Sequence, residues 1–107
     1  MTILVSIPEG TTAYLTVTFL NKAGAQAAPA SATWEVIDVY SGIVMKTSAA
    51  ISPIAAQVEL TIPASANAIQ DESHRNEQRR VIVKASYGVD DGVNDQYDYL
   101  VRNLSQV

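Results

Sequence analysis

The chain contains no cysteine among its 107 residues and only one histidine. The absence of cysteine excludes disulfide bonds, thiolate zinc sites and a cysteine nucleophile. One histidine without cysteine also cannot supply the usual ligand set of a transition-metal site. We therefore expect a fold that is held together without oxidation, and we expect neither a metal ion nor a cofactor.

Basic residues are scarce, with seven Lys and Arg against eleven Asp and Glu, for a net charge of -4. Three of the four arginines lie between Arg75 and Arg80, where Asp71, Glu72 and Glu77 offset their charge. Phosphate backbones are bound by clustered basic side chains. The composition therefore predicts that nucleic acid is not a partner.

The sequence also has no long apolar run and no glycine-rich loop. No run approaches the ~18 apolar residues of a membrane helix. Residues 1–7 are mostly apolar, but no basic region precedes them and they end at Pro8-Glu9-Gly10, which predicts a strand and a turn rather than a signal peptide. We expect no membrane contact and no small-molecule substrate.

The strongest positive signal is a long hairpin over residues 78–103. Two runs rich in β-branched and aromatic residues flank Asp91-Gly92, a dipeptide typical of tight hairpin turns. The rest of the chain repeats short alternating runs separated by turn residues, which is the pattern of an all-β protein.

About seven antiparallel strands are expected in one domain, residues 1–107, arranged as a single immunoglobulin-like β-sandwich. The lone Trp34 on the third strand fits the core of such a fold. A short helical turn is expected within residues 64–69, and residues 70–78 should be solvated. Besides the hairpin, the expected strands are residues 2–7, 13–19, 32–40, 43–47 and 57–62, with 48–56 as a connection.

One expectation concerns the surface of the sheet formed by the third strand and the hairpin. Alternation places four large apolar residues on the face opposite the core: Ile37, Val39, Ile82 and Leu100. An exposed apolar patch usually marks a protein contact, so these are the predicted contact residues. The alternative is that a loop, residues 25–31 or 48–56, folds over them.

Catalytic and metal sites are less well supported by the sequence. His74 has no Gly-x-Ser-x-Gly context and lies in the most polar segment, so a surface role is favoured over a serine triad. Residues 90–95 resemble a calcium loop in composition, but a hairpin tip explains them equally. The carboxylate pairs Asp95/Asp98 and Glu35/Asp38 could be proposed as a general acid and base. Their three-residue spacing, however, puts the two side chains of each pair on opposite faces of a strand. We expect no enzyme activity.

Four segments resemble small immunoglobulin-like proteins of tailed bacteriophages and prophages, in particular the amino-terminal modules of baseplate and tail proteins. The segments are residues 7–19, 31–36, 58–64 and 79–87 before a terminal tyrosine-rich strand. The resemblance implies a non-catalytic structural or accessory part of a virion head, connector or tail. It also implies other virion proteins, and a second copy of the chain, as partners, and a location in the virion or in the host bacterial cytoplasm before assembly.

A second function class remains open at this point. β-Sandwiches also serve as carbohydrate- or cell-surface-binding modules, which need aromatic rings exposed to solvent. Tyr14 and Tyr40 are the candidates for such rings. A third class, a small hydrolase, would need a pocket where His74 meets a hydroxyl and a carboxylate.

Overall fold

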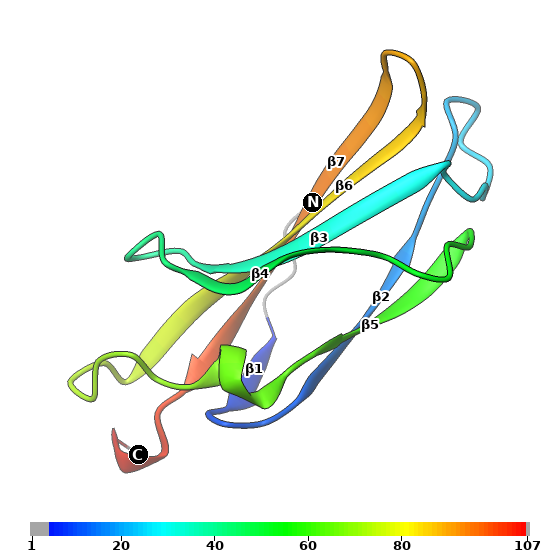
Figure 1. Ribbon diagram of the computed structural model, residues 1–107. Coiled ribbons are helices and arrows are strands. Elements are labelled where there is room, and N and C mark those ends of the chain that lie inside the picture. The colour runs from blue at the N-terminus through cyan, green and yellow to red at the C-terminus, as the bar shows by residue number, and fades with distance from the viewer. Residues whose placement is uncertain (1–4, 107) are drawn as a thin grey trace.

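The computed structural model describes residues 5–106 and shows two packed β-sheets, which confirms the all-β sandwich (Figure 1). The larger sheet has five strands in the order β1-β7-β6-β3-β4, and the smaller sheet pairs β2 with β5. All neighbours within the sheets are antiparallel except β1 and β7. Half of the expected first strand, residues 2–4 of 2–7, lies outside the described residues. The strands are β1 (Ser6–Pro8), β2 (Ala13–Thr18), β3 (Ser31–Asp38), β4 (Val44–Ala50), β5 (Gln57–Ile62), β6 (Asn76–Gly88) and β7 (Asp91–Arg102).

The core lies between the sheets because each central strand alternates apolar and polar residues. In β3 every second residue is buried, and β6 shows the same alternation along most of its length. From the smaller sheet, Val17, Leu60 and Ile62 meet this buried row. The buried apolar side chains are Val17, Phe19, Ala32, Trp34, Val36, Leu60, Ile62, Ala66, Val81, Val83, Ala85, Tyr99 and Val101.

The long hairpin forms as predicted, but its turn lies two residues earlier than expected. Gly88 pairs with Asp91, so Val89 and Asp90 form the turn and Gly92 lies within β7. Asp90 has φ 58°, the left-handed conformation that Asp tolerates better than most residues. A register shift between Ser86 and Gly88 extends the ladder to this point. The hairpin tip projects beyond the smaller sheet and contributes to an elongated shape of 46 × 23 × 20 Å (Figure 1).

The expected connection over residues 48–56 is wrong in its first part. β4 continues to Ala50, which pairs with Thr33. The small residues at the end of β4 form a strand because β3 supplies an edge for pairing, not because they favour strands themselves. The link from β3 to β4 is also longer than the expected two-residue turn, with residues 39–43 between the strands.

The expected helical turn is present as a 3-10 helix, η1 (Ala64–Asn67), and a second one, η2 (Leu104–Gln106), follows β7. Asn67 of η1 is fully buried and bridges distant segments. Its side chain donates to the Thr11 carbonyl at 2.8 Å and accepts from the Tyr99 hydroxyl at 2.6 Å. Through these bonds η1 holds the turn between β1 and β2 against β7.

Candidate protein-contact surfaces

The outer face of the five-stranded sheet, opposite the core, carries Ile37, Ile82 and Leu100 of the four predicted contact residues. The fourth, Val39, lies just after β3, which ends at Asp38 and not at residue 40 as expected. Ile37, Val39, Ile82 and Leu100 are all partly exposed and alternate with buried neighbours. β4 pairs beside β3 in the plane of the sheet, so residues 44–50 do not fold over this face. The placement leaves the four side chains available for contact, and their role as contact residues stays a prediction.

The register shows that the four residues do not form one continuous strip. Ile37 lies opposite Arg80, which in turn lies opposite Asp98. Arg80 Nε donates to Asp98 Oδ1 at 2.9 Å, so an ion pair interrupts the apolar surface. Gln78 lies opposite Leu100 and donates to Asp98 at 2.8 Å. Sequence reasoning missed this interruption because it followed apolar residues along strands and not across them.

This ion pair is electrostatically well matched. The hydrogen bond from Arg80 holds the pKa of Asp98 below its ordinary value; burial opposes this, and Gln78 adds to it. In turn, the Asp98 carboxylate raises the pKa of Arg80. The centre of the outer face is therefore charged and internally neutralised, with apolar side chains on either side of it.

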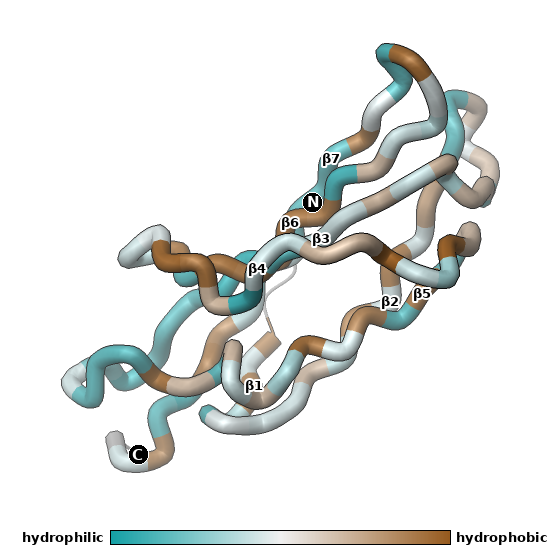
Figure 2. The backbone as a smooth tube through the Cα atoms, in the orientation of Figure 1, coloured by the Kyte–Doolittle hydropathy of each residue, from teal (hydrophilic) through white to brown (hydrophobic). Residues whose placement is uncertain are grey.

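Three of the exposed large apolar residues, Tyr40, Ile43 and Val44, lie where β3 turns into β4. We call residues Ile37, Val39, Tyr40, Ile43 and Val44 the end patch. Ile37 pairs with Val44, and the Ile43 carbonyl accepts from the Asp38 N–H at 2.8 Å, so the backbone segments that carry the patch lie side by side across the turn. Tyr40 is 85% exposed, and its ring lies edge-on to His74 at 5.6 Å. Figure 2 shows this apolar stretch at the start of β4.

A second apolar surface is a groove between β2 and the β1–β7 edge. It consists of two adjoining hollows, of about 140 and 430 Å³, which share Tyr97. Tyr97 donates its hydroxyl to Asp95 Oδ2 at 3.1 Å. Burial, with Asp95 adding to it, raises the pKa of Tyr97 to about 12.

A buried polar cluster closes the sandwich beside η1. The Arg79 guanidinium is fully buried and donates to Asp38 Oδ1 at 2.6 Å and Glu77 Oε1 at 3.0 Å. It also donates to the carbonyls of Ala66 and Ala68 at 3.1 and 2.7 Å. We call Arg79, Asp38 and Glu77 the arginine cluster. Because acceptors within the chain bind the donors of this buried guanidinium, Arg79 is not exposed to orient a partner protein.

The expectation that residues 70–78 are solvated is wrong at Glu77, which is buried. Burial raises the pKa of Glu77, but donors from Gln70, His74, Arg79 and Asp71 outweigh it, so the pKa is lowered overall. The signal for this burial was in the sequence, because Glu77 and Arg79 continue the alternation of Val81 and Val83. Charged side chains in the phase of the core face indicate a buried pair.

His74 contacts carboxylates and an aromatic ring. Its Nδ1 lies 2.9 Å from Glu77 Oε2, and its Nε2 lies 3.6 Å from Asp71 Oδ2. The nearby Ser73 hydroxyl donates to Asp71 at 2.7 Å. Among the described residues, the polar contacts of the His74 ring are therefore to carboxylates, and the hydroxyl–imidazole contact of a serine triad is not among them.

The proposed carboxylate pairs lie on opposite faces, as their spacing predicts. Asp38 is buried in the arginine cluster, while Glu35 is partly exposed on the outer face. Asp95 is directed to Tyr97 in the groove, and Asp98 to Arg80 on the outer face. Within residues 5–106, no group of three His, Cys, Asp or Glu side chains is placed to hold a metal ion.

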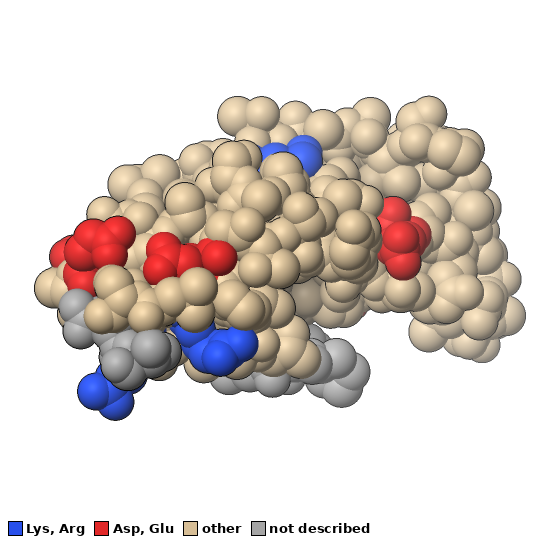
Figure 3. All heavy atoms as spheres, turned by 90° about the horizontal axis from the view of Figure 1, so that it is seen from below, with Lys and Arg blue, Asp and Glu red and all other residues tan. Residues whose placement is uncertain are grey.

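Charged side chains are sparse on one face of the molecule. On the face seen from below in Figure 3, acidic and basic side chains form a few separate groups, and uncharged residues cover most of the area. In the part of the chain that is described, no helix is long and apolar enough to cross a membrane. Comparisons with protein families, curated proteins and solved structures found no match.

Proposed function

We propose that this protein is a non-catalytic structural or accessory component of a phage or prophage virion and that it acts through protein–protein contacts. The observation that carries the contact role is the set of partly exposed apolar side chains on the outer face and the end patch. Ile43 and Val44 are about half exposed there, next to Tyr40. Apolar residues gathered in this way are typical of surfaces that another protein covers.

The virion assignment rests on the resemblance of the strand and turn segments to immunoglobulin-like phage proteins. Two features of the fold support an immunoglobulin-like sandwich. Trp34 is buried on β3 beside β6, and β6 lies between β3 and β7 in the larger sheet. Such sandwiches commonly serve as modules that are held by surface contact.

Both parts of the proposal can be tested with one set of particles. The tagged protein is expressed in a strain that carries the prophage, particles are induced and purified on a density gradient, and their proteins are identified by mass spectrometry. We expect the wild-type protein in the particle fraction. Absence from purified particles, with normal expression in the cell, would reject the virion role.

Two double variants test the contact surface. We expect Ile82→Ser with Leu100→Ser, and separately Ile37→Ser with Val44→Ser, to reduce incorporation at least fivefold. The control is Val89→Ser, which removes an exposed apolar side chain at the hairpin tip. Circular dichroism of each purified variant establishes that it is folded. Normal incorporation of both folded double variants would remove the outer face and end patch from the proposal.

The alternative, a carbohydrate- or cell-surface-binding module, is favoured by one observation. Tyr14 is 66% exposed and Tyr40 is 85% exposed. They do not act as a ring pair, because Tyr14 lines the groove while Tyr40 packs against His74. Binding on a glycan array that is lost in either Tyr14→Ala or Tyr40→Ala would establish this alternative and would show which ring carries it.

A further inference from the structure

The strand β2 has an edge that is free for pairing. The Phe19 N–H donates to the Ala56 carbonyl at 2.8 Å, in continuation of the β2–β5 register. Antiparallel strands direct alternate residues toward and away from the partner. The N–H and C=O groups of Tyr14, Thr16 and Thr18 therefore point away from β5, and no strand pairs with that edge in the described part of the chain.

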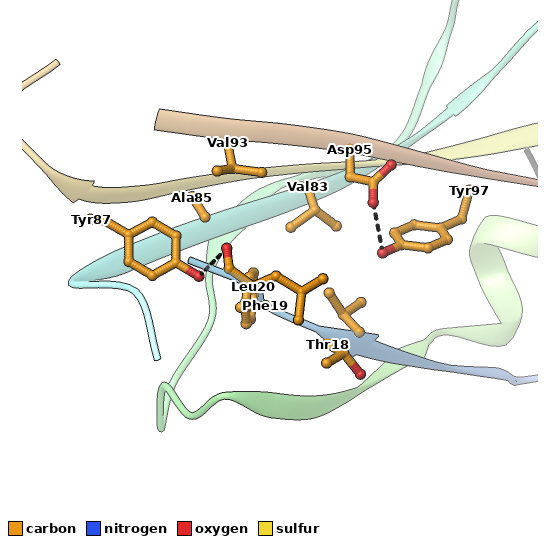
Figure 4. Close-up of a pocket in the computed structure, with 10 residues that line it drawn as sticks. Thr18, Phe19, Leu20, Val83, Ala85, Tyr87, Val93, Asp95 and Tyr97 are labelled. Atoms are coloured by element: carbon orange, nitrogen blue, oxygen red, sulfur yellow. Dashed lines mark hydrogen bonds between the residues drawn. The ribbon is translucent and has the colours of Figure 1, made fainter. Parts of the chain in front are cut away.

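The groove runs along this free edge. Its floor includes Val17, Phe19 and Val83, which are buried in the core. One end is closed by Tyr87, whose hydroxyl donates to the carbonyls of Leu20 and Ala27 at 3.1 and 2.9 Å. Figure 4 shows the Tyr87–Leu20 bond and the Asp95–Tyr97 bond within this part of the groove. A groove of this kind offers pockets to every second side chain of an added strand.

The β2 edge also lacks the usual protection against strand addition. Residues 13–20 contain neither a charged residue nor a proline. Native proteins blunt free edges with charge, proline or bulges. β5, the other strand of the same sheet, does carry a charge, at Glu59. The β2 edge is therefore the one that is open to another chain.

We propose that the groove binds an extended segment of another protein, which adds to β2 as a strand. The segment has apolar residues at alternate positions and a basic residue near Asp95. Asp95 is the charged side chain that faces the groove, because the Asp98 side chain is directed to Arg80 on the outer face. A second copy of β2 would bring no basic residue to Asp95. This inference goes beyond the proposed function because it uses a different surface and a different binding mode.

The proposal is tested with a displayed library of random ten-residue peptides, selected on the full-length protein. We expect the enriched peptides to alternate apolar residues and to contain Lys or Arg. Binding of a synthetic enriched peptide is then measured by fluorescence anisotropy. No enrichment, or enrichment without alternation, would overturn the proposal.

Two proline variants distinguish peptide binding at the free edge of β2 from binding at the free edge of β5. Thr16→Pro removes an N–H that points to the groove, and we expect it to weaken binding at least tenfold. Glu59→Pro removes the corresponding outward N–H on the far edge of β5, and we expect a change of less than twofold. Asp95→Asn should weaken binding three- to tenfold, and should have no effect when the basic residue of the peptide is replaced by Gln. Equal binding to both proline variants would overturn strand addition at β2.

The peptide itself provides a test that does not depend on the folding of Thr16→Pro. N-methylation of the amides that face β2 should abolish binding, whereas methylation of the intervening amides should preserve it. Equal effects at both sets would contradict the proposal. Self-association of the wild-type protein that Thr16→Pro abolishes would assign the edge to a second copy instead. Binding seen only after removal of residues 2–4 would assign the groove to the chain's own N-terminal segment.

Discussion

Arg79 and Asp38 meet in the interior at 2.6 Å, although 41 residues separate them in the sequence. The pair joins β6 to β3 at the end of the core, and both side chains are almost completely buried. Burial of two charges costs several kcal/mol per ion, and it is tolerated only where hydrogen bonds satisfy both groups. The arginine cluster meets this condition, because no buried side-chain polar atom among the described residues lacks a partner.

The first prediction concerns this cluster. Replacement of Arg79 by Met should lower the free energy of unfolding by about 3–5 kcal/mol, because it leaves Asp38 as a buried carboxylate without a cation and leaves Glu77 with His74 alone. Urea unfolding followed by circular dichroism measures the change. Adding Asp38→Asn to Arg79→Met should restore part of the loss by removing the uncompensated charge of Asp38.

Arg75 provides the matched control for Arg79. It is exposed, and its replacement by Met should change stability by less than about 0.5 kcal/mol. A loss below about 1 kcal/mol in Arg79→Met would show that the cluster contributes little to stability. An Asp38→Asn addition that worsens the Arg79→Met defect would contradict the argument from uncompensated charge.

The sequence predicts the strands well where alternation is strong. The faces of β3, β5, β6 and β7 follow from every second residue being apolar, and this placed Ile37, Ile82 and Leu100 on the outer face. The sharing of one sheet by β3, β6 and β7 also follows from the expected sandwich. These features depend on local pattern, and local pattern is visible in a sequence.

Other features depend on partners that are distant in the sequence. Ala49 and Ala50 have weak strand preference and belong to β4 only because β3 offers an edge. The ion pair between Arg80 and Asp98, which divides the outer face, is set by the cross-strand register. The groove depends on the smaller sheet having only two strands, and no residue pattern in β2 or β5 fixes that number.

The second prediction is a loss of stability as pH rises above the ordinary pKa of histidine, about 6.5. The hydrogen bond to Glu77 raises the pKa of His74 above 6.5; burial partly opposes this, while Asp71, Glu77 and Asp38 add attraction. A raised pKa in the folded state means that the protonated imidazole stabilises the fold. This contribution is complete below the unfolded value, near 6.5, and is lost as pH rises through the folded value.

Thermal unfolding from pH 5 to pH 9 checks this expectation, together with an NMR titration of the His74 ring. The melting temperature of the wild type should fall over the window above about pH 6.5, the ordinary histidine value. In His74→Asn the melting temperature should change less over the same pH window. A folded-state pKa for His74 below 6.5 would contradict the predicted role of Glu77.

The third prediction concerns the hairpin turn, where Asp90 has φ 58°. A β-branched residue is strained in this conformation, so Asp90→Val should lower the free energy of unfolding by about 1–2 kcal/mol. Asp90→Gly relieves the strain but increases the freedom of the unfolded chain, so its net effect should stay within about 0.5 kcal/mol. Both values come from urea unfolding. The control is Val89→Thr at the neighbouring position, because Val89 is exposed and threonine, like valine, is branched at Cβ. If Asp91→Val proved more harmful than Asp90→Val, the turn would instead be centred on Asp91-Gly92, as the dipeptide alone suggests.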